Sequence, residues 1–191
     1  AYYDNINTKN EVRVKFLGGS DEYYETVTPV KLNVSKQSTG VNTTVKPAVI
    51  SWSITANTNL KTLKDAILVD TIEDDQKYVK GSMKLNETEI DTEDSEILSW
   101  DEETATFTVS LPDGANSHTL TYKTEIVKDP SNYGKNNDEY YNKVDLINYS
   151  KNEEPIKETV SADATARYYA GNNNNNPIKD GEQDLETDLI V

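Results

Sequence analysis

Three residues with complementary side-chain chemistry each fall on the apolar side of a strand-like stretch: the amine Lys36, the carboxyl Asp70 and the carboxamide Asn142. Successive side chains of a strand point to opposite faces, so each residue shares its face with apolar neighbours two positions away. Burying a polar group without a partner costs roughly 2–7 kcal/mol, and burying a charge costs more. We therefore predict that the three side chains are buried partners. The chemistry open to them is an amide crosslink between the amine and the carboxamide.

A series of alternating stretches supplies the strands that would position these residues. Turn-rich segments separate the stretches, and no segment shows a helical period over about twelve residues. Many short strands with this spacing predict an all-β fold, an immunoglobulin-like antiparallel β-sandwich. The predicted strands are 11–16, 32–36, 50–56, 66–72, 104–111, 119–127, 142–147 and 159–168, and the clearest turns are 55–59, 112–114 and 129–138.

Composition narrows the classes of function. A chain of 191 residues has room for one sandwich domain of about 100–150 residues with flanking segments. Its 34 acidic residues against 19 Lys and Arg disfavour nucleic acid and anionic membranes as partners. The absence of cysteine excludes disulfides, thiol catalysis and Cys-ligated metals. No apolar run reaches about 18 residues, so we expect no membrane insertion, and with no signal peptide or anchoring tail we expect an exported chain to be an excised piece.

Short stretches near both ends of the chain resemble stretches in its middle. The matching ranges are 10–14 with 142–146, 25–28 with 158–161, and 189–191 with 32–34. The first two pairs have nearly the same offset, which indicates a tandem array of similar modules. Chance similarity between short strands is the alternative interpretation.

The array hypothesis divides the chain into three parts. Residues 1–30 would be tail strands of a preceding module or an N-terminal extension, and 31–170 would be the complete sandwich. Residues 171–191 would be a linker and the start of the next module, since 171–177 has a linker composition. Asn10 would then be the crosslink asparagine of the preceding module. The first segment would otherwise pair with an exposed sheet edge or another copy of the chain.

Several motifs in order resemble the collagen-adhesin-type repeat domains of Gram-positive bacteria. The resemblance spans about residues 32–165 and depends on the order and spacing of the motifs, because each is loose by itself. The motifs are 50–57, 63–72, 76–82, 120–126 and 141–146. Domains of this family are immunoglobulin-like sandwiches, and many carry an intramolecular isopeptide bond. The resemblance implies Lys36 as the amine, Asn142 as the acyl donor and Asp70 as the catalytic acid.

The implied reaction needs these three types of side chain. Burial lowers the pKa of a lysine, so a neutral and nucleophilic amine becomes available. Burial raises the pKa of a carboxyl, so Asp70 can stay protonated and hydrogen-bond the Asn142 carbonyl oxygen. Attack by Lys36 would expel ammonia once, so we do not expect an enzyme, and no cofactor or metal is needed.

The predicted function is that of a structural stalk or adhesin module in an extracellular, cell-wall-anchored bacterial surface protein. Its partners would be the neighbouring modules of the same polypeptide. The alternative is a ligand-binding adhesin domain that recognises a host or extracellular-matrix protein. Tandem repetition favours the stalk, and a shared fold by itself does not confer an affinity for collagen.

Each candidate residue also has a purely structural interpretation. Lys36 can extend its amine to the surface, and Asp70 can open a turn after a strand. Trp52 and Trp100 are more typical of core or rim packing than of a ligand platform.

The remaining candidates for chemistry are weak. The acidic clusters 73–75 and 180–184 lack the spacing of a calcium-binding loop, so we interpret them as solvated loops. His118 is the only histidine, so no Ser-His-Asp triad can form without it and no pair of histidines can bind a metal. A glycosidase carboxylate pair is the least favoured alternative.

Overall fold

The computed structural model describes residues 30–90, 96–128, 137–152 and 154–169. The predicted strand 11–16, the candidate Asn10 and most of the two flanking segments lie outside the described residues. The division of the chain into modules therefore stays a prediction.

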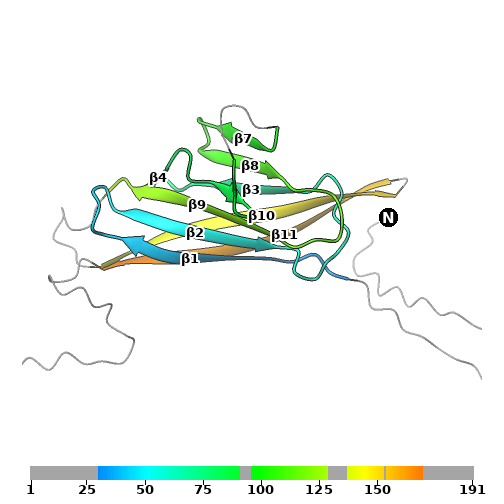
Figure 1. Ribbon diagram of the computed structural model, residues 1–191, viewed down its shortest axis with the longest axis horizontal. Helices are drawn as coiled ribbons and strands as arrows, with labels where there is room; N and C mark the ends of the chain where they lie inside the picture. The colour runs from blue at the N-terminus through cyan, green and yellow to red at the C-terminus, as the bar shows by residue number, and fades with distance from the viewer. Residues whose placement is uncertain (1–29, 91–95, 129–136, 153, 170–191) are drawn as a thin grey trace, which may run out of the picture.

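Two antiparallel sheets pack face to face, and the described residues contain no helix (Figure 1). One sheet has the strand order β1-β2-β9-β5-β6, with β4 also paired to β9, and the other has the order β11-β10-β3-β8-β7. This confirms the predicted immunoglobulin-like antiparallel β-sandwich. The strands are β1 (Val34–Asn42), β2 (Val49–Ala56), β3 (Ile67–Thr71), β4 (Gln76–Tyr78), β5 (Lys84–Leu85), β6 (Thr88–Glu89), β7 (Leu98–Asp101), β8 (Thr106–Ser110), β9 (His118–Ile126), β10 (Asn137–Asn152) and β11 (Glu154–Tyr169).

Alternating side chains of the central strands build the core between the sheets. In β2, Ile50, Trp52 and Ile54 have no exposed surface, whereas the residues between them are partly exposed. Across the interface, Leu68 of β3 and Phe107 of β8 are equally buried. Each large apolar side chain removed from water contributes about 1.5–3 kcal/mol, so this alternation is sufficient reason for the sheets to pack.

The hairpin of β10 and β11 is longer than the sequence pattern predicted. The two strands pair without a break from Asn137 opposite Tyr169 to Asn152 opposite Glu154. The predicted turn 129–138 therefore extends too far, because β10 already begins at Asn137. Backbone pairing with a neighbouring strand stabilises extended structure even where apolar and polar residues do not alternate in the sequence.

Four short strands, β4 to β7, were missed by the sequence prediction. Each has two to four residues, which is too short for an alternating pattern to be distinguished from a loop. They form because neighbouring strands offer free backbone groups: β4 and β5 pair with the nine-residue β9, β6 pairs with β5, and β7 pairs with β8.

The described chain enters and leaves the sandwich at opposite ends of its long axis. Figure 1 shows β1 starting near one end and β11 finishing at the other. The two strands lie alongside one another where the edges of the sheets meet.

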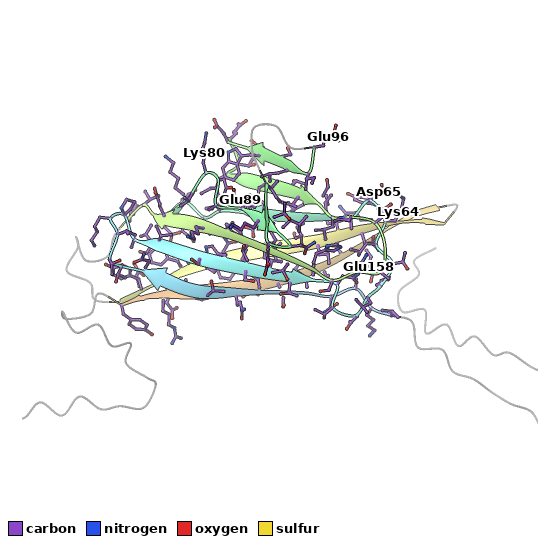
Figure 2. The ribbon with its side chains drawn as sticks, viewed as in Figure 1. Lys64, Asp65, Lys80, Glu89, Glu96 and Glu158 are labelled. Carbon is purple, nitrogen blue, oxygen red and sulfur yellow. The ribbon has the colours of Figure 1, made fainter. Side chains whose placement is uncertain are left out.

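Charged side chains extend from the outer surfaces, as Figure 2 shows for the labelled lysines and acids. Some form surface ion pairs, such as Lys64 with Asp113 and Lys61 with Glu158. Among the described residues, which include the acidic cluster 73–75, no group of three or more acids or histidines is arranged to hold a metal ion. No helix in that part of the chain is long and apolar enough to cross a bilayer.

Candidate crosslinking site

The three candidate residues lie in the closed interior between the sheets. Lys36 comes from β1 of one sheet, whereas Asp70 of β3 and Asn142 of β10 come from the other. Asp70 and Asn142 are 1% and 0% exposed, and the side chain of Lys36 has no exposed surface. The interpretations in which Lys36 reaches the surface or Asp70 opens a turn do not fit these positions.

Strand register explains why the side chains converge. Asp70 lies opposite Val144 in the pairing of β3 with β10, and Asn142 precedes Val144 by two residues in β10, so it lies on the same face. On the other sheet, β2 separates β1 from β9, and pairing brings Lys36 opposite Ile54 and Trp52 opposite Tyr122. These inward faces oppose each other across the core.

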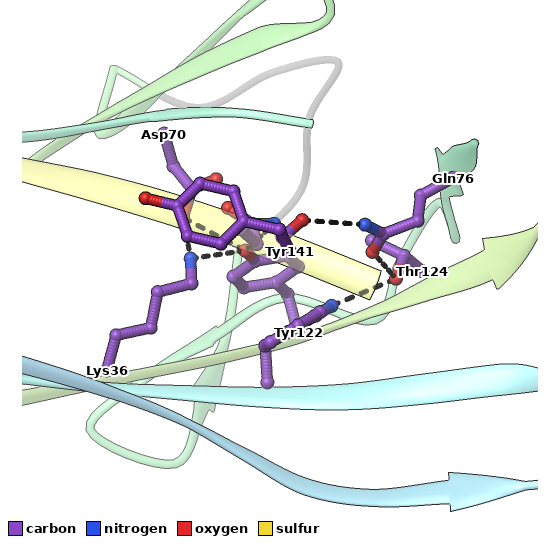
Figure 3. A network of polar contacts seen from close by, with 8 residues as sticks. Lys36, Asp70, Gln76, Tyr122, Thr124 and Tyr141 are labelled. Carbon is purple, nitrogen blue, oxygen red and sulfur yellow. Dashed lines mark hydrogen bonds and ion pairs between the residues drawn. The ribbon is translucent and has the colours of Figure 1, made fainter. Parts of the chain in front are cut away.

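A tyrosine hydroxyl joins the three groups. Lys36 Nζ forms an ion pair with Asp70 Oδ2 and donates a hydrogen bond to Tyr122 Oη at 2.8 Å. Tyr122 Oη donates to Asp70 Oδ2 at 2.9 Å, and Asn142 Nδ2 donates to Tyr122 Oη, also at 2.9 Å. Figure 3 shows Lys36 and Asp70 converging on Tyr122. Amine, carboxyl and carboxamide thus share one contact atom.

Burial shifts both members of the ion pair toward their neutral forms. Desolvation lowers the pKa of Lys36, although the negative charge of Asp70 opposes this shift. Desolvation raises the pKa of Asp70 to about 6, against the opposing effects of Lys36, Tyr122 and Asn142. The ammonium also lies 5.5 Å from the ring centroid of Trp52 and 5.2 Å from that of Tyr122. These ring contacts favour the ammonium, whereas desolvation favours the neutral forms. Because of desolvation, the free energy of the neutral pair lies closer to that of the ionised pair than it would in water.

Two oxygens of the site have no hydrogen-bond partner among the described residues. They are Asp70 Oδ1 and Asn142 Oδ1, and both are buried. An unsatisfied buried acceptor costs about 1–3 kcal/mol, so the interior favours a state in which a donor is added. Protonation of Asp70 supplies such a donor.

A second buried network anchors the backbone next to Asn142. Trp52 Nε1 donates to Thr124 Oγ1 at 2.9 Å, and Thr124 Oγ1 donates to Gln76 Oε1 at 2.8 Å. Gln76 Nε2 then donates to the carbonyl oxygen of Tyr141 at 2.9 Å (Figure 3). The network runs from the sheet that carries Lys36 to the strand that carries Asn142, so it holds the two sides of the site at a defined separation.

Sequence reasoning did not single out Tyr122, Thr124 or Gln76. A signal existed for the first two, because alternation in β9 places Leu120, Tyr122 and Thr124 on one inward face. A hydroxyl on such a face needs a partner for the same reason as Lys36 does. Gln76 gave no signal, since β4 is too short to show a pattern.

The other candidates from the sequence lie apart from this cluster or pack against it. Trp52 is fully buried, in agreement with the core interpretation, and Trp100 is half-buried. Trp100 and Tyr78 pair with ring centroids 5.4 Å apart and line an open cleft. The other residues that line this cleft are Ile72, Gln76, Lys77, Lys80, Glu102 and Ala105.

His118 is buried at the start of β9, where its Nδ1 lies 3.1 Å from Asn86 Nδ2.

Fold and site together define an immunoglobulin-like sandwich domain with a buried cluster of an amine, an acid and an amide. The sequence profile of the collagen binding domain family matches residues 33–157. The chain therefore belongs to this family, and the predicted family resemblance is confirmed. A comparison with curated protein sequences found no significant match.

Solved structures share the fold at low sequence identity. The major pilin subunit BcpA of Bacillus cereus aligns with a TM-score of 0.50 and 13% identity over 71% of this chain and 40% of the pilin. The collagen-binding domain of a Staphylococcus aureus adhesin aligns with a TM-score of 0.47 and 14% identity, over 73% of this chain and 100% of that domain. The collagen binding domain of the Erysipelothrix rhusiopathiae surface protein RspB aligns with a TM-score of 0.47 and 20% identity, over 80% of this chain and 56% of that chain. This chain thus spans less than half of the pilin's length.

Proposed function

We propose that the chain is a structural module of a bacterial cell-surface protein, stabilised by a self-formed isopeptide bond between Lys36 and Asn142. Asp70 acts as the acid that promotes the bond. The observation that carries this proposal is the contact of Lys36 Nζ, Asp70 Oδ2 and Asn142 Nδ2 with a single hydroxyl oxygen in a closed core. The shared contact brings the two nitrogens close together, and groups that reach a near-attack geometry gain roughly 7–11 kcal/mol over groups that must meet by diffusion.

The reaction begins with proton transfer within the buried ion pair. Lys36 gives a proton to Asp70, which leaves a neutral amine to attack the side-chain carbonyl carbon of Asn142. The protonated acid donates to the carbonyl oxygen, where negative charge develops. Collapse of the tetrahedral intermediate expels ammonia and leaves an amide between β1 and β10. The chain reacts once, so the module is not an enzyme.

Covalent joining of the first described strand to a late one suits a protein under tension. Force entering at β1 would pass through the crosslink to β10 and bypass residues 37–141. The start of β1 and the end of β11 lie at opposite ends of the sandwich in Figure 1, which supports an arrangement of modules in series. Membership of a family with pilin and adhesin relatives supports an extracellular location, with neighbouring modules as partners.

Intact-mass measurement of the folded protein tests the crosslink. We expect a mass below the sequence mass by one ammonia, about 17 Da. The loss should disappear in Lys36→Met and Asp70→Asn and persist in Lys123→Met, which removes an exposed lysine of β9. An unshifted mass in folded wild-type protein contradicts the proposal.

A second candidate function is recognition of an extracellular-matrix protein. The observation that favours it is the cleft with the Tyr78 and Trp100 rings at its wall, bordered by charged side chains. Tyr78 is buried and Trp100 is partly exposed, so the Trp100 ring is the aromatic surface that the cleft offers beside its charged groups. Binding to a collagen triple-helical peptide that is lost in Trp100→Ala and retained in Tyr169→Ala, which removes an exposed ring outside the cleft, would support this function. The absence of binding by the wild-type module would contradict it.

A further inference from the structure

Tyr122 Oη lies between the nitrogen that would attack and the nitrogen that would leave. Lys36 Nζ is 2.8 Å from this oxygen on one side, and Asn142 Nδ2 is 2.9 Å from it on another. We propose that Tyr122 is a catalytic residue of the crosslinking reaction, which relays a proton from the Lys36 nitrogen to the departing Asn142 nitrogen. This inference rests on the proposed crosslink and adds a step that the amine, acid and amide leave unassigned.

The hydrogen-bonding capacity of the hydroxyl matches this role. A phenol has one hydrogen to donate and two lone pairs to accept with. In the structure Tyr122 donates to Asp70 and accepts from Lys36 and Asn142, so all its capacity is used. An atom that accepts from both nitrogens can take a proton from one and give a proton to the other after its O–H turns from Asp70 toward Asn142.

The step balances in atoms and charge. After attack, the new bond joins Lys36 Nζ to Asn142 Cγ, and Nζ carries a positive charge while Oδ1 carries a negative one. Tyr122 Oη takes a proton from Nζ and gives its own proton to Nδ2. The Cγ–Nδ2 bond then breaks, its electron pair leaves with ammonia, and the carbonyl reforms. Tyr122 ends as the neutral phenol, and Asp70 keeps the proton that it took from Lys36.

A separate relay is needed because Asp70 has another task. Its proton stabilises the negative charge on Asn142 Oδ1 and is not available between the two nitrogens at the same time. Tyr122 is 1% exposed, and its ring packs edge-on against Phe107 with centroids 4.9 Å apart, so the hydroxyl is held in place. Burial and the charge of Asp70 raise the pKa of Tyr122 well above its usual value, so the phenol is neutral before and after the transfer.

The first experiment compares Tyr122→Phe with a matched variant, Tyr140→Phe. Both remove one buried hydroxyl that makes a hydrogen bond, and Tyr140 Oη donates to Lys128 O at 3.0 Å, away from the nitrogens. Chains are purified from inclusion bodies in denaturant, and intact mass selects the preparations that still have the full sequence mass and so have not reacted. Refolding starts the reaction, tryptophan fluorescence follows folding, and intact mass at timed intervals follows the loss of ammonia.

We expect Tyr122→Phe to fold and to crosslink roughly 100-fold more slowly, the usual loss when a proton-transfer group is removed. Tyr140→Phe should react at the wild-type rate. If wild type reacts and folded Tyr122→Phe reacts equally fast, the relay is wrong and the crosslink stands. If wild type does not lose ammonia, the proposed function fails and the relay fails with it.

A second measurement on the wild-type chain covers the case in which Tyr122→Phe does not fold. Two protons move in the relay, so the crosslinking rate should be lower in D₂O than in H₂O. In mixtures of the two solvents, a plot of the rate against the fraction of deuterium should fall below the straight line that joins its two ends. Folding is completed first at about pH 4, where a second proton on the pair keeps Lys36 charged and crosslinking should be slow, and the rate is then measured after a jump to about pH 7.5. A rate that is unchanged in D₂O, or that falls linearly, overturns the relay.

Discussion

At the scale of single residues, the site is a compromise between charge and reactivity. Burying the ionised pair of Lys36 and Asp70 costs less free energy than burying either charge alone, because each charge compensates the other. The pair is reactive only when the proton has moved from the amine to the acid. Desolvation makes that transfer easier, and the rings of Trp52 and Tyr122 favour the ammonium. The interior thus sets how often the reactive form is present.

The pH dependence of crosslinking follows from these shifts. The reactive pair holds one proton in total, as does the ionised pair, so the rate should be constant between the pKa of Asp70 and that of Lys36. Below the Asp70 pKa of about 6, a second proton keeps the amine charged, and the rate should fall as the pH decreases. Timed mass measurements from about pH 5 to pH 8 check this. A rate that rises toward pH 5 would contradict it.

At the scale of elements, buried polar groups tie the two sheets together at the height of the site. Thr124 of β9 accepts from Trp52 of β2 and donates to Gln76 of β4, which holds the backbone of β10 at Tyr141. Apolar packing between sheets is non-directional and would tolerate small slips. Hydrogen bonds along this path fix the relative position of β9 and β10. They therefore also fix the distance between the sheet that carries Lys36 and the strand that carries Asn142.

Thr124→Val tests this structural role. Valine keeps the shape of threonine and suits a strand, but it leaves the Trp52 indole and the Gln76 carbonyl without their partner. We expect a loss of about 1–3 kcal/mol in the free energy of unfolding, measured by denaturant titration in the Lys36→Met background, which cannot crosslink. The half-exposed Thr121→Val, on the opposite face of β9, is the control and should change the free energy by less than about 0.5 kcal/mol. Equal losses in both variants would contradict the role of the network.

At the scale of the whole molecule, the crosslink would close a loop of about 100 residues between β1 and β10. Closing a loop of this length restricts the unfolded chain and, on a disulfide-like estimate, stabilises the fold by roughly 4–5 kcal/mol. Reducing conditions do not break an amide. The domain would therefore keep this gain in environments where a disulfide could be lost.

Thermal unfolding measures that contribution. We expect the melting temperature of wild type to exceed those of Lys36→Met and Asp70→Asn by roughly 10–20 °C. Each of these variants also leaves the other member of the buried pair without its charge partner. Asn142→Ala keeps that pair and cannot crosslink, so the loss of melting temperature that it shares with the two variants reports the bond. Calorimetry on wild type and the three variants checks this, and Lys123→Met should have the melting temperature of wild type. Melting temperatures of the two variants that match wild type would contradict it.

Much of the fold could be predicted from the sequence, because alternation is a local property. Residues two apart in a strand share a face, so the inward positions of Lys36, Asp70 and Asn142 followed from their apolar neighbours alone. The lengths of β10 and β11 could not be predicted in this way, since strand pairing extends them past the alternating pattern. The short strands β4 to β7 depend on their neighbours for the same reason.

The sequence by itself determined that an amine, an acid and an amide face the interior of a β-sandwich, since that depends only on which way each side chain points from its own strand. The tertiary structure decided that they meet, and that they meet at the hydroxyl of Tyr122. That meeting depends on the pairing register within each sheet and on how one sheet is placed over the other. Both are set by contacts between residues far apart in the chain, which no local pattern records.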